Sequence, residues 1–413
     1  MAVESIGIDF GTTNTCVAIR ENGLVRVLAL DPTSSQAELF RTLIYIPSRQ
    51  ECFFGAGAIE QYFDRGMEGR FFQSVKKLLP NIEFTGTSVF GTHMGIESLV
   101  ARFISELKQR IEKQIGPIEA IPIAMGRPAR YSLDEKREAT AVIRFQKAIE
   151  LGGLKNVRLI EEPVAAALSS PERNERGNKL VLVCDLGGGT SDFTLFRGGG
   201  ETLSVYGVPV AGDSLDSDFF SAKLTTHFGS EIKYQRPFSH NILTLPLSFV
   251  KILPKWHHHA FLRERSTWNF ILDLRKELVD PLQKPLLENL ITLVEENLGY
   301  QLHQEVERIK VQLSAKEEEK FLFQSYPIKI DFNVLAKEYE RVIERSVVEI
   351  KEAALETVAL AKLNATDVEL LQFTGGTAKV PKIRRELTAL FPNAKVVDSE
   401  AFTAVAEGLA RVN

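Results

Sequence analysis

The chain has 413 residues, of which 44% are hydrophobic and 25% are charged, and its formal net charge is −4. These values are ordinary for a globular protein, and they exclude a disordered tail, a collagen-like rod and a small disulfide-bonded scaffold. The near balance of 50 Lys and Arg against 54 Asp and Glu argues against non-specific nucleic-acid binding, which needs a basic face. At roughly 100–200 residues per domain, the length predicts two to four folding units.

The cysteines and the N-terminal residues predict a compartment. Three cysteines occur, Cys16, Cys52 and Cys184, without a Cys-x-x-Cys spacing, and two of them lie in apolar, strand-like runs that favour buried free thiols. Residues 1–6 lack the basic and apolar regions of a signal peptide, and no apolar run reaches the ~20 residues needed to span a membrane. We therefore expect a soluble, cytoplasmic protein without a membrane partner.

Two segments of the chain are similar in pattern. Residues 5–19 and 180–196 each predict a buried apolar strand, an Asp near its end, a Gly/Thr turn and a second strand. The corresponding acidic residues, Asp9 and Asp185, are 176 positions apart, which is about one domain length. We therefore expect two related lobes, each beginning with a β-hairpin.

Helical patterns follow these hairpins. A capping box at 132–135 predicts a helix that runs to Leu151 and ends at Gly152-Gly153, and 162–168 predicts a short helix with Pro163 in its first turn. The polar stretch 171–178 predicts a lobe boundary. Further on, 295–314 and 335–363 have helical periodicity, and the charged run 316–320 indicates a solvated helix end. Residues 216–307 are irregular and rich in Pro, which predicts a separate subdomain.

The glycine turns are the first candidates for chemistry. Turns such as Gly11-Thr12-Thr13 and Gly187-Gly188-Gly189-Thr190 can bring backbone N–H groups and hydroxyls to phosphate oxygens. Carboxylates nearby, at Asp9, Asp185 and Asp192, supply the oxygen partners that Mg²⁺ or its waters prefer. Strand 370–374, turn Gly375-Gly376-Thr377 and helix 382–390 could hold a phosphate or a ribose, although a structural strand–helix turn is the commoner interpretation. No Walker A motif occurs.

Five motifs in the same order carry a resemblance to a known family. They occupy 8–14, 75–79, 160–167, 185–192 and 375–381, and residues 126–128 and 407–411 add to them. Together they resemble the ATPase domain of the DnaK-type, seventy-kilodalton heat-shock chaperones in the actin and sugar-kinase superfamily, with short YegD-like members most similar. The resemblance implies an α/β fold of two actin-like (ribonuclease H-like) lobes around a nucleotide cleft. Lobe I would be 1–176 with the final helix 398–413, and lobe II would be 177–397 with an enlarged insertion at 217–306.

The resemblance also implies a role for individual residues, with ATP or ADP and Mg²⁺ as cofactors. Lys76 would reach the γ-phosphate and the attacking water, Thr190 would lie beside that phosphate, and Glu162 and Asp192 would order the water or act as base. Asp9 and Asp185 would hold hydrated Mg²⁺. The other residues implied to bind the nucleotide are Gly11, Thr12, Thr13, Asn14, Gly187, Gly188, Gly189, Gly212, Glu307, Lys310, Ser314, Gly375, Gly376 and Thr377. From sequence alone, the lysine and the glutamate at 162 would be an ordinary surface cation and a helix-start carboxylate.

The chain also departs from the family pattern. Val311 stands where the family has the Arg that stacks on adenine, and Phe402 lies in the segment where the family has Pro-Asp-Glu. Loss of the stacked cation could cost ~0.5–2 kcal/mol of base binding. The stretch from Asp216 to Glu307 is longer than in the family, and no peptide-binding domain follows Asn413 in this sequence.

Three functions remain open. The first is a chaperone-like, Mg²⁺-dependent ATP-binding protein with weak ATPase activity and no peptide-binding domain. The second is a non-catalytic nucleotide sensor that presents the 217–306 insert to a protein partner, and the third is a small-molecule kinase of the superfamily. The oligomeric state cannot be predicted. The run His257-His258-His259 could bind a metal ion, but a solvated loop is the commoner interpretation.

Overall fold

The computed structural model of the chain describes residues 3–34, 36–128, 130–132, 134–169, 178–197, 201–398 and 403–412. These residues form two compact units. Unit 1 comprises the described residues within Met1–Gly212, Glu349–Lys379 and Ile383–Asn413, and unit 2 comprises Asp213–Val348 and Val380–Lys382. The lobe boundary predicted at 171–178 lies almost entirely outside the described residues, so the predicted lobe limits stay a prediction.

The first sheet of unit 1 has the strand order β3–β2–β1–β10–β11, with β4 attached to β2. Strands β1, β2 and β3 are antiparallel neighbours, whereas β10 and β11 continue the sheet in parallel with β1. The bounds are β1 (Val3–Phe10), β2 (Asn14–Glu21), β3 (Leu24–Val27), β4 (Phe40–Arg41), β10 (Ile123–Arg127) and β11 (Val157–Glu161). The predicted first hairpin is therefore confirmed.

The second sheet of unit 1 repeats this topology. Its order is β14–β13–β12–β19–β20, again with two antiparallel pairs followed by two parallel pairs. The bounds are β12 (Leu180–Leu186), β13 (Ser191–Arg197), β14 (Glu201–Val208), β19 (Leu370–Thr374) and β20 (Lys395–Asp398). In the two hairpins, Asp9 pairs with Cys16 and Asp185 pairs with Asp192, so the two acidic residues hold equivalent places. The expected duplication of the hairpin extends to the whole sheet.

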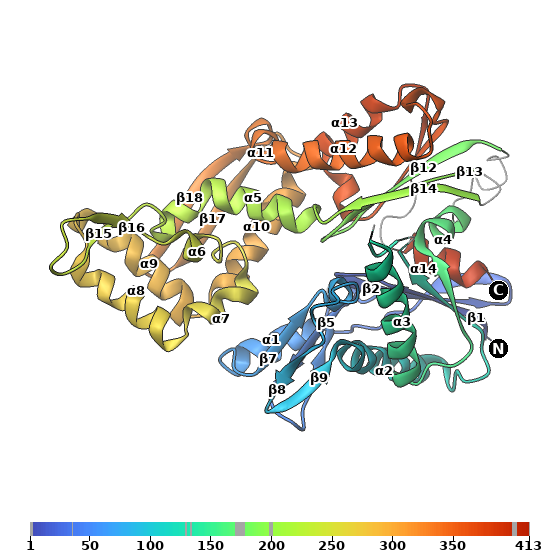
Figure 1. Ribbon diagram of the computed structural model, residues 1–413, viewed down its shortest axis with the longest axis horizontal. Coiled ribbons are helices and arrows are strands. Elements are labelled where there is room, and N and C mark those ends of the chain that lie inside the picture. Colours follow the sequence, from blue (N-terminus) through green and yellow to red (C-terminus); the bar gives the residue numbers. More distant parts are fainter. Residues whose placement is uncertain are drawn as a thin grey trace. The chain divides into compact units, whose positions relative to one another are not determined.

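Helices cover both faces of the first sheet, because its strands alternate two sets of apolar side chains. Large residues such as Ile8 and Phe10 pack in the main core with α2 (Ile96–Ile115) and α3 (Glu135–Leu151). Small residues such as Ala18 face α14 (Ala404–Arg411), which also packs on α4 (Glu162–Ser169). A Cβ at Gly7 would overlap the backbone of α14. Glycine and alanine are therefore what let this helix lie directly on the sheet (Figure 1).

The remaining elements of unit 1 flank these sheets. Helix α12 begins in unit 2 and its later turns lie in unit 1, where the Ser204 hydroxyl donates to the Thr357 carbonyl at 2.5 Å. The elements are α1 (Gly55–Asp64), α12 (Glu344–Leu360), α13 (Pro381–Leu390), β5 (Leu43–Ile46), β6 (Phe53–Phe54), β7 (Arg70–Gln73), β8 (Gly86–Val89), β9 (Thr92–Gly95), η1 (Val75–Leu78) and η7 (Gly376–Lys379).

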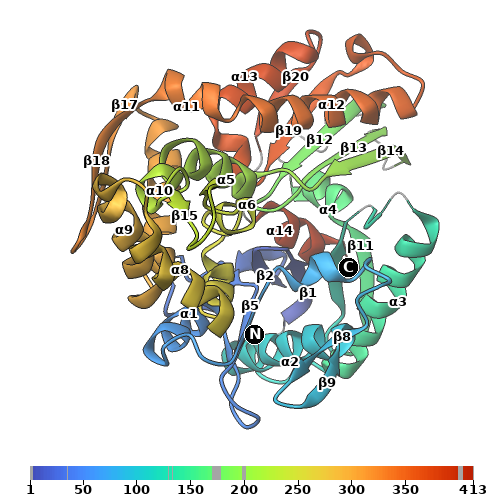
Figure 2. The same ribbon diagram turned by 60° about the vertical axis from the view of Figure 1, so that its left-hand side comes forward.

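Unit 2 is mainly helical. Its β17–β18 hairpin packs on α10, and both ribbon views show these elements together (Figures 1 and 2). The elements are α5 (Gly212–Lys223), α6 (Leu247–Val250), α7 (His259–Leu262), α8 (Arg265–Glu277), α9 (Lys284–Glu295), α10 (Gly299–Leu313), α11 (Ala336–Val342), β15 (Lys233–Gln235), β16 (Ile242–Thr244), β17 (Glu318–Ser325), β18 (Ile328–Leu335), η3 (Thr225–Phe228), η4 (Trp256–His258) and η5 (Pro281–Gln283), whereas η6 (Ala365–Asp367) belongs to unit 1.

Several predicted elements are confirmed and others are wrong. The helix ending at Leu151 is present, with the Asp134 side chain accepting from the Arg137 amide, and the short helix at Glu162 is also present. The charged run 316–320 does not end a helix, because β17 begins at Glu318. Within the described residues, no helix combines the length and the apolar character needed to cross a membrane.

Candidate functional site

The turn of the first hairpin is tightly closed by hydrogen bonds. The Thr42 hydroxyl donates to the Gly11 carbonyl at 2.9 Å, and the Thr42 amide donates to the Thr13 carbonyl at 2.9 Å. A Cβ at residue 11 would overlap the Asn14 carbonyl oxygen, so the turn requires glycine. The Thr13 hydroxyl is buried and has no hydrogen-bond partner among the described residues. A buried, unpaired hydroxyl is costly, which indicates a place for an oxygen-rich ligand.

The turn of the second hairpin is joined to the third glycine element. The Gly187 amide donates to the Thr190 carbonyl at 3.0 Å, and the Gly187 carbonyl accepts from the Thr377 hydroxyl at 2.7 Å. The Gly212 amide also donates to this carbonyl, at 3.4 Å. Gly375 has a φ of +84°, and a Cβ there would overlap the backbone of Leu186. Three of the predicted nucleotide-binding segments are therefore in contact.

A buried ion pair lies beside the hairpins of unit 1. The Lys76 ammonium donates to the Glu162 carboxylate at 2.6 Å, and the two side chains are only 7% and 13% exposed. Lys76 belongs to η1, which follows Ser74 in a left-handed backbone conformation, and Glu162 begins α4, where the helix dipole favours a negative charge. These two residues are 86 positions apart in the chain. The surface position that sequence alone predicts for Lys76 is therefore wrong, whereas Glu162 does begin a helix, as predicted.

Three partly buried carboxylates lie near this pair. Burial, and then the charge of Glu162, raises the pKa of Asp9 to about 7, although Lys76 opposes the shift. Burial raises the pKa of Asp192 to about 6, while a hydrogen bond from Thr190 acts in the opposite direction. Burial and the neighbouring carboxylates also hold the pKa of Asp185 well above its usual range.

The pKa of Lys76 is also raised, which favours its charged form. Burial alone would lower the pKa of Lys76, but the charges of Glu162 and Asp9 outweigh it and the pKa is raised. One buried cation therefore faces several carboxylates. An additional positive charge would relieve their mutual repulsion, so the donor set fits a hydrated divalent cation.

Two residues that the sequence did not single out also belong to this region. The Lys77 ammonium donates to the Gly189 carbonyl at 3.0 Å, and it lies where a Cβ on that glycine would be. The Tyr131 hydroxyl is buried without a partner among the described residues, and the charge of Glu162 contributes to its raised pKa. Lys77 directly follows Lys76 in the motif 75–79, and this position is a sequence signal that indicates it. Tyr131 had no such signal.

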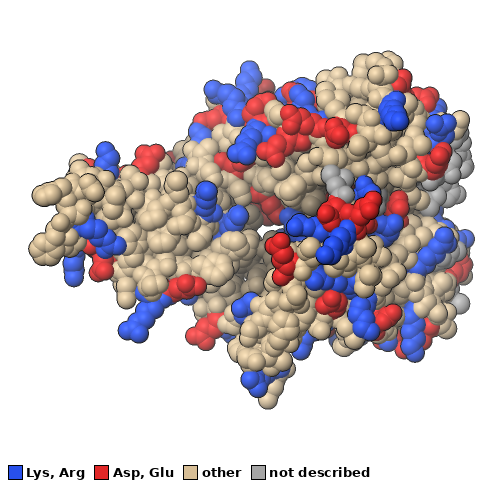
Figure 3. All heavy atoms as spheres, viewed as in Figure 1, with Lys and Arg blue, Asp and Glu red and all other residues tan. Residues whose placement is uncertain are grey.

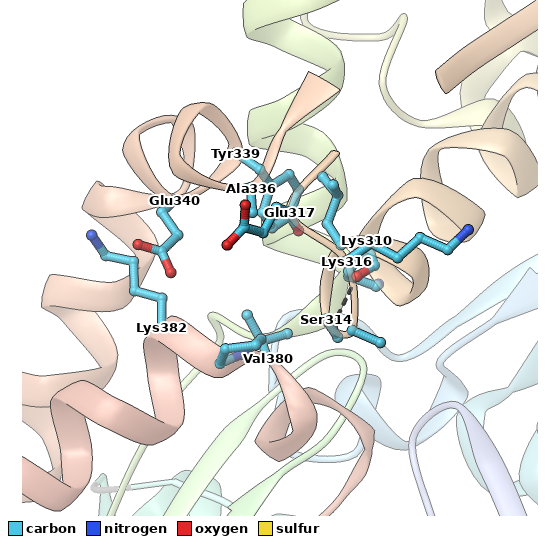
Figure 4. Close-up of a pocket in the computed structure, with 12 residues that line it drawn as sticks. Lys310, Ser314, Lys316, Glu317, Ala336, Tyr339, Glu340, Val380 and Lys382 are labelled. Atoms are coloured by element: carbon cyan, nitrogen blue, oxygen red, sulfur yellow. Dashed lines mark hydrogen bonds between the residues drawn. The ribbon is translucent and has the colours of Figure 1, made fainter. Parts of the chain in front are cut away.

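Unit 2 contains the segment predicted to bind adenosine. A pocket of about 250 Å³ is lined by Lys310, Ser314, Tyr339, Val380 and Lys382 among others (Figure 4). The Ser314 hydroxyl donates to the Lys310 carbonyl at 3.0 Å, one helical turn back.

The charge of Lys310 is already neutralised. Its ammonium donates to the Asp216 carboxylate at 2.6 Å and points away from Glu317 and Glu340 in Figure 4. Val311 is 58% exposed. Neither it nor Glu307 lines this pocket, so the pocket brings together two of the three predicted adenosine contacts. Phe402 lies outside the described residues.

The histidine run does not form the solvated loop that was expected. His257 and His258 are in η4 and His259 begins α7, where its ring is 4% exposed and bonded through Nε2 to the Leu253 carbonyl at 2.9 Å. The neighbouring Trp256 is buried. In the part of the chain that the structure describes, no group of three or more His, Cys, Asp or Glu side chains is arranged to hold a metal ion directly.

The comparison with protein families agrees with this architecture. A family model described as Hsp70 protein matches residues 71–241 and 287–412, which together make up more than half of the chain. Residues 242–286 of unit 2 lie between the two matched ranges. ATPase domains of this family bind ATP or ADP with Mg²⁺, and the match supports an ATP-binding, chaperone-like protein. With its mixed α/β architecture and its paired sheets of identical topology, the chain belongs to the Hsp70 family and has the actin-like ATPase fold of that family.

Proposed function

We propose that this chain binds ATP or ADP together with Mg²⁺ in unit 1 and hydrolyses ATP slowly. The observation that carries the proposal is the buried Lys76–Glu162 pair, set beside three partly buried carboxylates whose pKa values are raised. Such an excess of negative charge away from bulk solvent is unfavourable unless a cation compensates it. Perturbed buried carboxylates beside a cation are also typical of functional sites.

The chain's own residues have distinct parts in the proposed reaction. Lys76 stabilises negative charge that develops on the transferred phosphoryl group, and its ion pair fixes the position of Glu162. Asp192, with a pKa of about 6, is ionised for the most part at neutral pH and can accept a proton from the attacking water. Thr190 donates to Asp192 and holds that carboxylate in place.

The remaining residues would bind and orient the nucleotide and Mg²⁺. Bound Mg²⁺ would supply neutralisation of phosphate charge. Asp9 and Asp185 would hold it through water, since the described residues include no direct ligand cluster. The unpaired Thr13 hydroxyl, the neighbouring Thr12 and the amides of the Gly187–Gly189 turn would donate to phosphate oxygens. As the family resemblance implies, Gly212, Gly375 and Gly376 would contribute to phosphate binding in unit 1, and Glu307, Lys310 and Ser314 of unit 2 are the proposed adenosine contacts.

The proposal includes the lobe limits inferred from the sequence. Lobe I would be 1–176 with 398–413, and lobe II would be 177–397 with the insert 217–306. The repeated strand order supports two related lobes. Each lobe would contain one series of five neighbouring strands that includes a hairpin with an Asp residue.

Hydrolysis of radiolabelled ATP by the purified chain tests the proposal. Lys76→Ala and Asp185→Ala should each lower turnover about 100-fold, as expected for loss of one preorganised charge. Lys136→Ala is the matched control, because this lysine is exposed on α3 and should leave turnover unchanged. Wild-type turnover no faster than that of both site variants would refute catalysis.

A second candidate is a non-catalytic nucleotide sensor that presents the insert to a protein partner. It is favoured by the exposed Val311 and by the insert segment 242–286, which lies outside the family match. Calorimetry with ATP and ADP separates the two candidates, since the sensor binds nucleotide without turning it over. No binding of either nucleotide would eliminate both.

A further inference from the structure

The insert of unit 2 exposes an unusual share of apolar side chains. Among the described residues, 18 large hydrophobic side chains are exposed, and seven of them fall within the 45 residues 238–282. The set is Phe238, Ile242, Leu243, Leu247, Phe261, Val279 and Leu282. Figure 3 shows uncharged residues over the end of unit 2 that carries β15 and β16, with Lys and Arg side chains next to them. Exposed apolar residues gathered in this way indicate an interaction surface.

The same region has an open strand edge. Strand β16 pairs with β15, and the far side of β15 is closed by the bridge from Tyr234 to Leu278 and by the Val279 amide, which donates to the Lys233 carbonyl. Within the described residues, β15 and β16 form a sheet of only two strands, and all three residues of β16 are exposed. An unpaired edge of this kind is a template for another strand.

The side chains on the two faces of β16 differ. Leu243 lies opposite Tyr234, whose buried ring contacts Phe270 at a centroid distance of 5.8 Å, so this face continues the core of the insert. The other face carries Ile242 and Thr244, and Thr244 lies opposite Lys233. A strand added at this edge would therefore place one face beside Leu243 and the other near a cation.

The charge of the segment fits an acidic partner. Residues 233–284 contain nine Lys and Arg against four Asp and Glu, a net charge of +5 in a chain whose total is −4. A second copy docked through the same edge would bring two positive segments together. A lipid surface would leave the backbone groups of the edge unpaired in hydrocarbon. Both occupants are therefore less suitable than an acidic peptide.

We propose that the open edge of β16 binds an extended segment of a partner protein, in which aliphatic or β-branched residues alternate with Asp or Glu. The segment adds a third strand to β15–β16, with its aliphatic side chains beside Leu243 and its carboxylates toward Lys233. This inference rests on the partner contact proposed above for the insert, and it names the chemistry of that partner.

The test measures binding of fluorescein-labelled heptapeptides to the full chain by fluorescence anisotropy. The panel alternates Val, Ile or Thr with Asp or Glu, and a matched panel replaces the acids with Lys. We expect the acidic peptides to bind and the basic ones to bind at least about 10-fold more weakly. Methylation of the peptide's backbone nitrogens on its pairing edge should abolish binding, because strand addition depends on main-chain hydrogen bonds.

Two variants locate the site. Leu243→Lys, at a side chain already 42% exposed, should weaken binding of acidic peptides at least about 10-fold, whereas Leu24→Lys, at a 76% exposed position on β3, should not. Lys233→Glu should shift the preference toward basic peptides, which keeps the test valid if the first variant folds poorly.

Four results would overturn the proposal. They are no binding by any acidic peptide, equal binding of N-methylated peptides, Leu243-dependent binding to phosphatidylserine vesicles in place of peptides, and Leu243-dependent dimerisation in sedimentation experiments. Calorimetric titration of the same variants with ATP gives an independent result. Failure of the peptide site with intact ATP binding is thus distinguishable from failure of the proposed nucleotide function.

Discussion

Removing one partner of the buried charge pair in unit 2 should lower the free energy of unfolding substantially. Removing both partners should change it little. The Lys310 ammonium and the Asp216 carboxylate are 2.6 Å apart, and their side chains are 15% and 5% exposed. The Oδ1 atom of Asp216 is buried and has no hydrogen-bond partner among the described residues. Lys310→Met therefore leaves a carboxylate with no compensating charge, which costs about 3–5 kcal/mol.

The double variant Lys310→Met/Asp216→Leu removes both charges and keeps most of the volume. We expect it to lie within about 1 kcal/mol of the wild type, because replacing a buried pair with apolar residues is often neutral or stabilising. The coupling between the two substitutions should then be about 2 kcal/mol or more.

Tryptophan fluorescence during urea unfolding measures this change in unit 2 specifically. The chain has two tryptophans, Trp256 and Trp268, and both belong to unit 2. With a slope of about 1–3 kcal/mol per molar urea, the single variant should move the midpoint down by at least about 1 M. A single variant that loses less than about 1 kcal/mol, or a double variant no more stable than the single, would refute the reasoning, since the pair would then behave as an exposed one.

Three further outcomes are expected. Val311→Arg should strengthen ATP binding about 2–30-fold in calorimetry by restoring a cation that can stack on the base, and an unchanged affinity would contradict that placement of adenine. Because burial lowers the pKa of His259 to about 4, the unfolded chain binds the proton first as pH falls from about 6.5. The free energy of unfolding of unit 2 should thus fall by up to about 3 kcal/mol between pH 6.5 and 4. The fall should be smaller in the His259→Gln variant. Gly408→Ala should destabilise unit 1 in thermal unfolding by about 2 kcal/mol or more, because its Cβ would overlap the Ala165 carbonyl. Gly57→Ala on α1 should not, because its Cβ would meet only the Thr33 hydroxyl, at an ordinary contact distance of 3.9 Å.

Local chemistry explains what could be predicted from the sequence. The two hairpins were recognisable because their apolar strands and Gly/Thr turns are short-range patterns, and the end of α3 followed from a double glycine. The proximity of Lys76 and Glu162 has no such signal, since 86 residues separate them. Their placement could come only from the family resemblance, and their near-complete burial became visible only in the structure.

The errors have physical causes as well. The hairpin β17–β18 was missed although Phe321 and Phe323 alternate with exposed neighbours, because the charges before it are equally typical of a helix end. The pairing of Lys310 with Asp216 has no local sequence signal, because 94 residues separate the two side chains. The sequence predicts a loop at His259 because the buried partner of this side chain is a backbone carbonyl, which no sequence pattern reveals.

The seating of α14 on the first sheet has a consequence for synthesis of the chain. The Ser5 hydroxyl donates to the Ala410 carbonyl across 405 residues, and Ala18 packs with Ala406 in the same small-residue contact. At about 5–20 residues per second, synthesis of the intervening residues takes about 20–80 s. During that time the face of β1 and β2 that α14 later covers has no helix packed on it. The first sheet can thus reach its final packing only after α14 has been made.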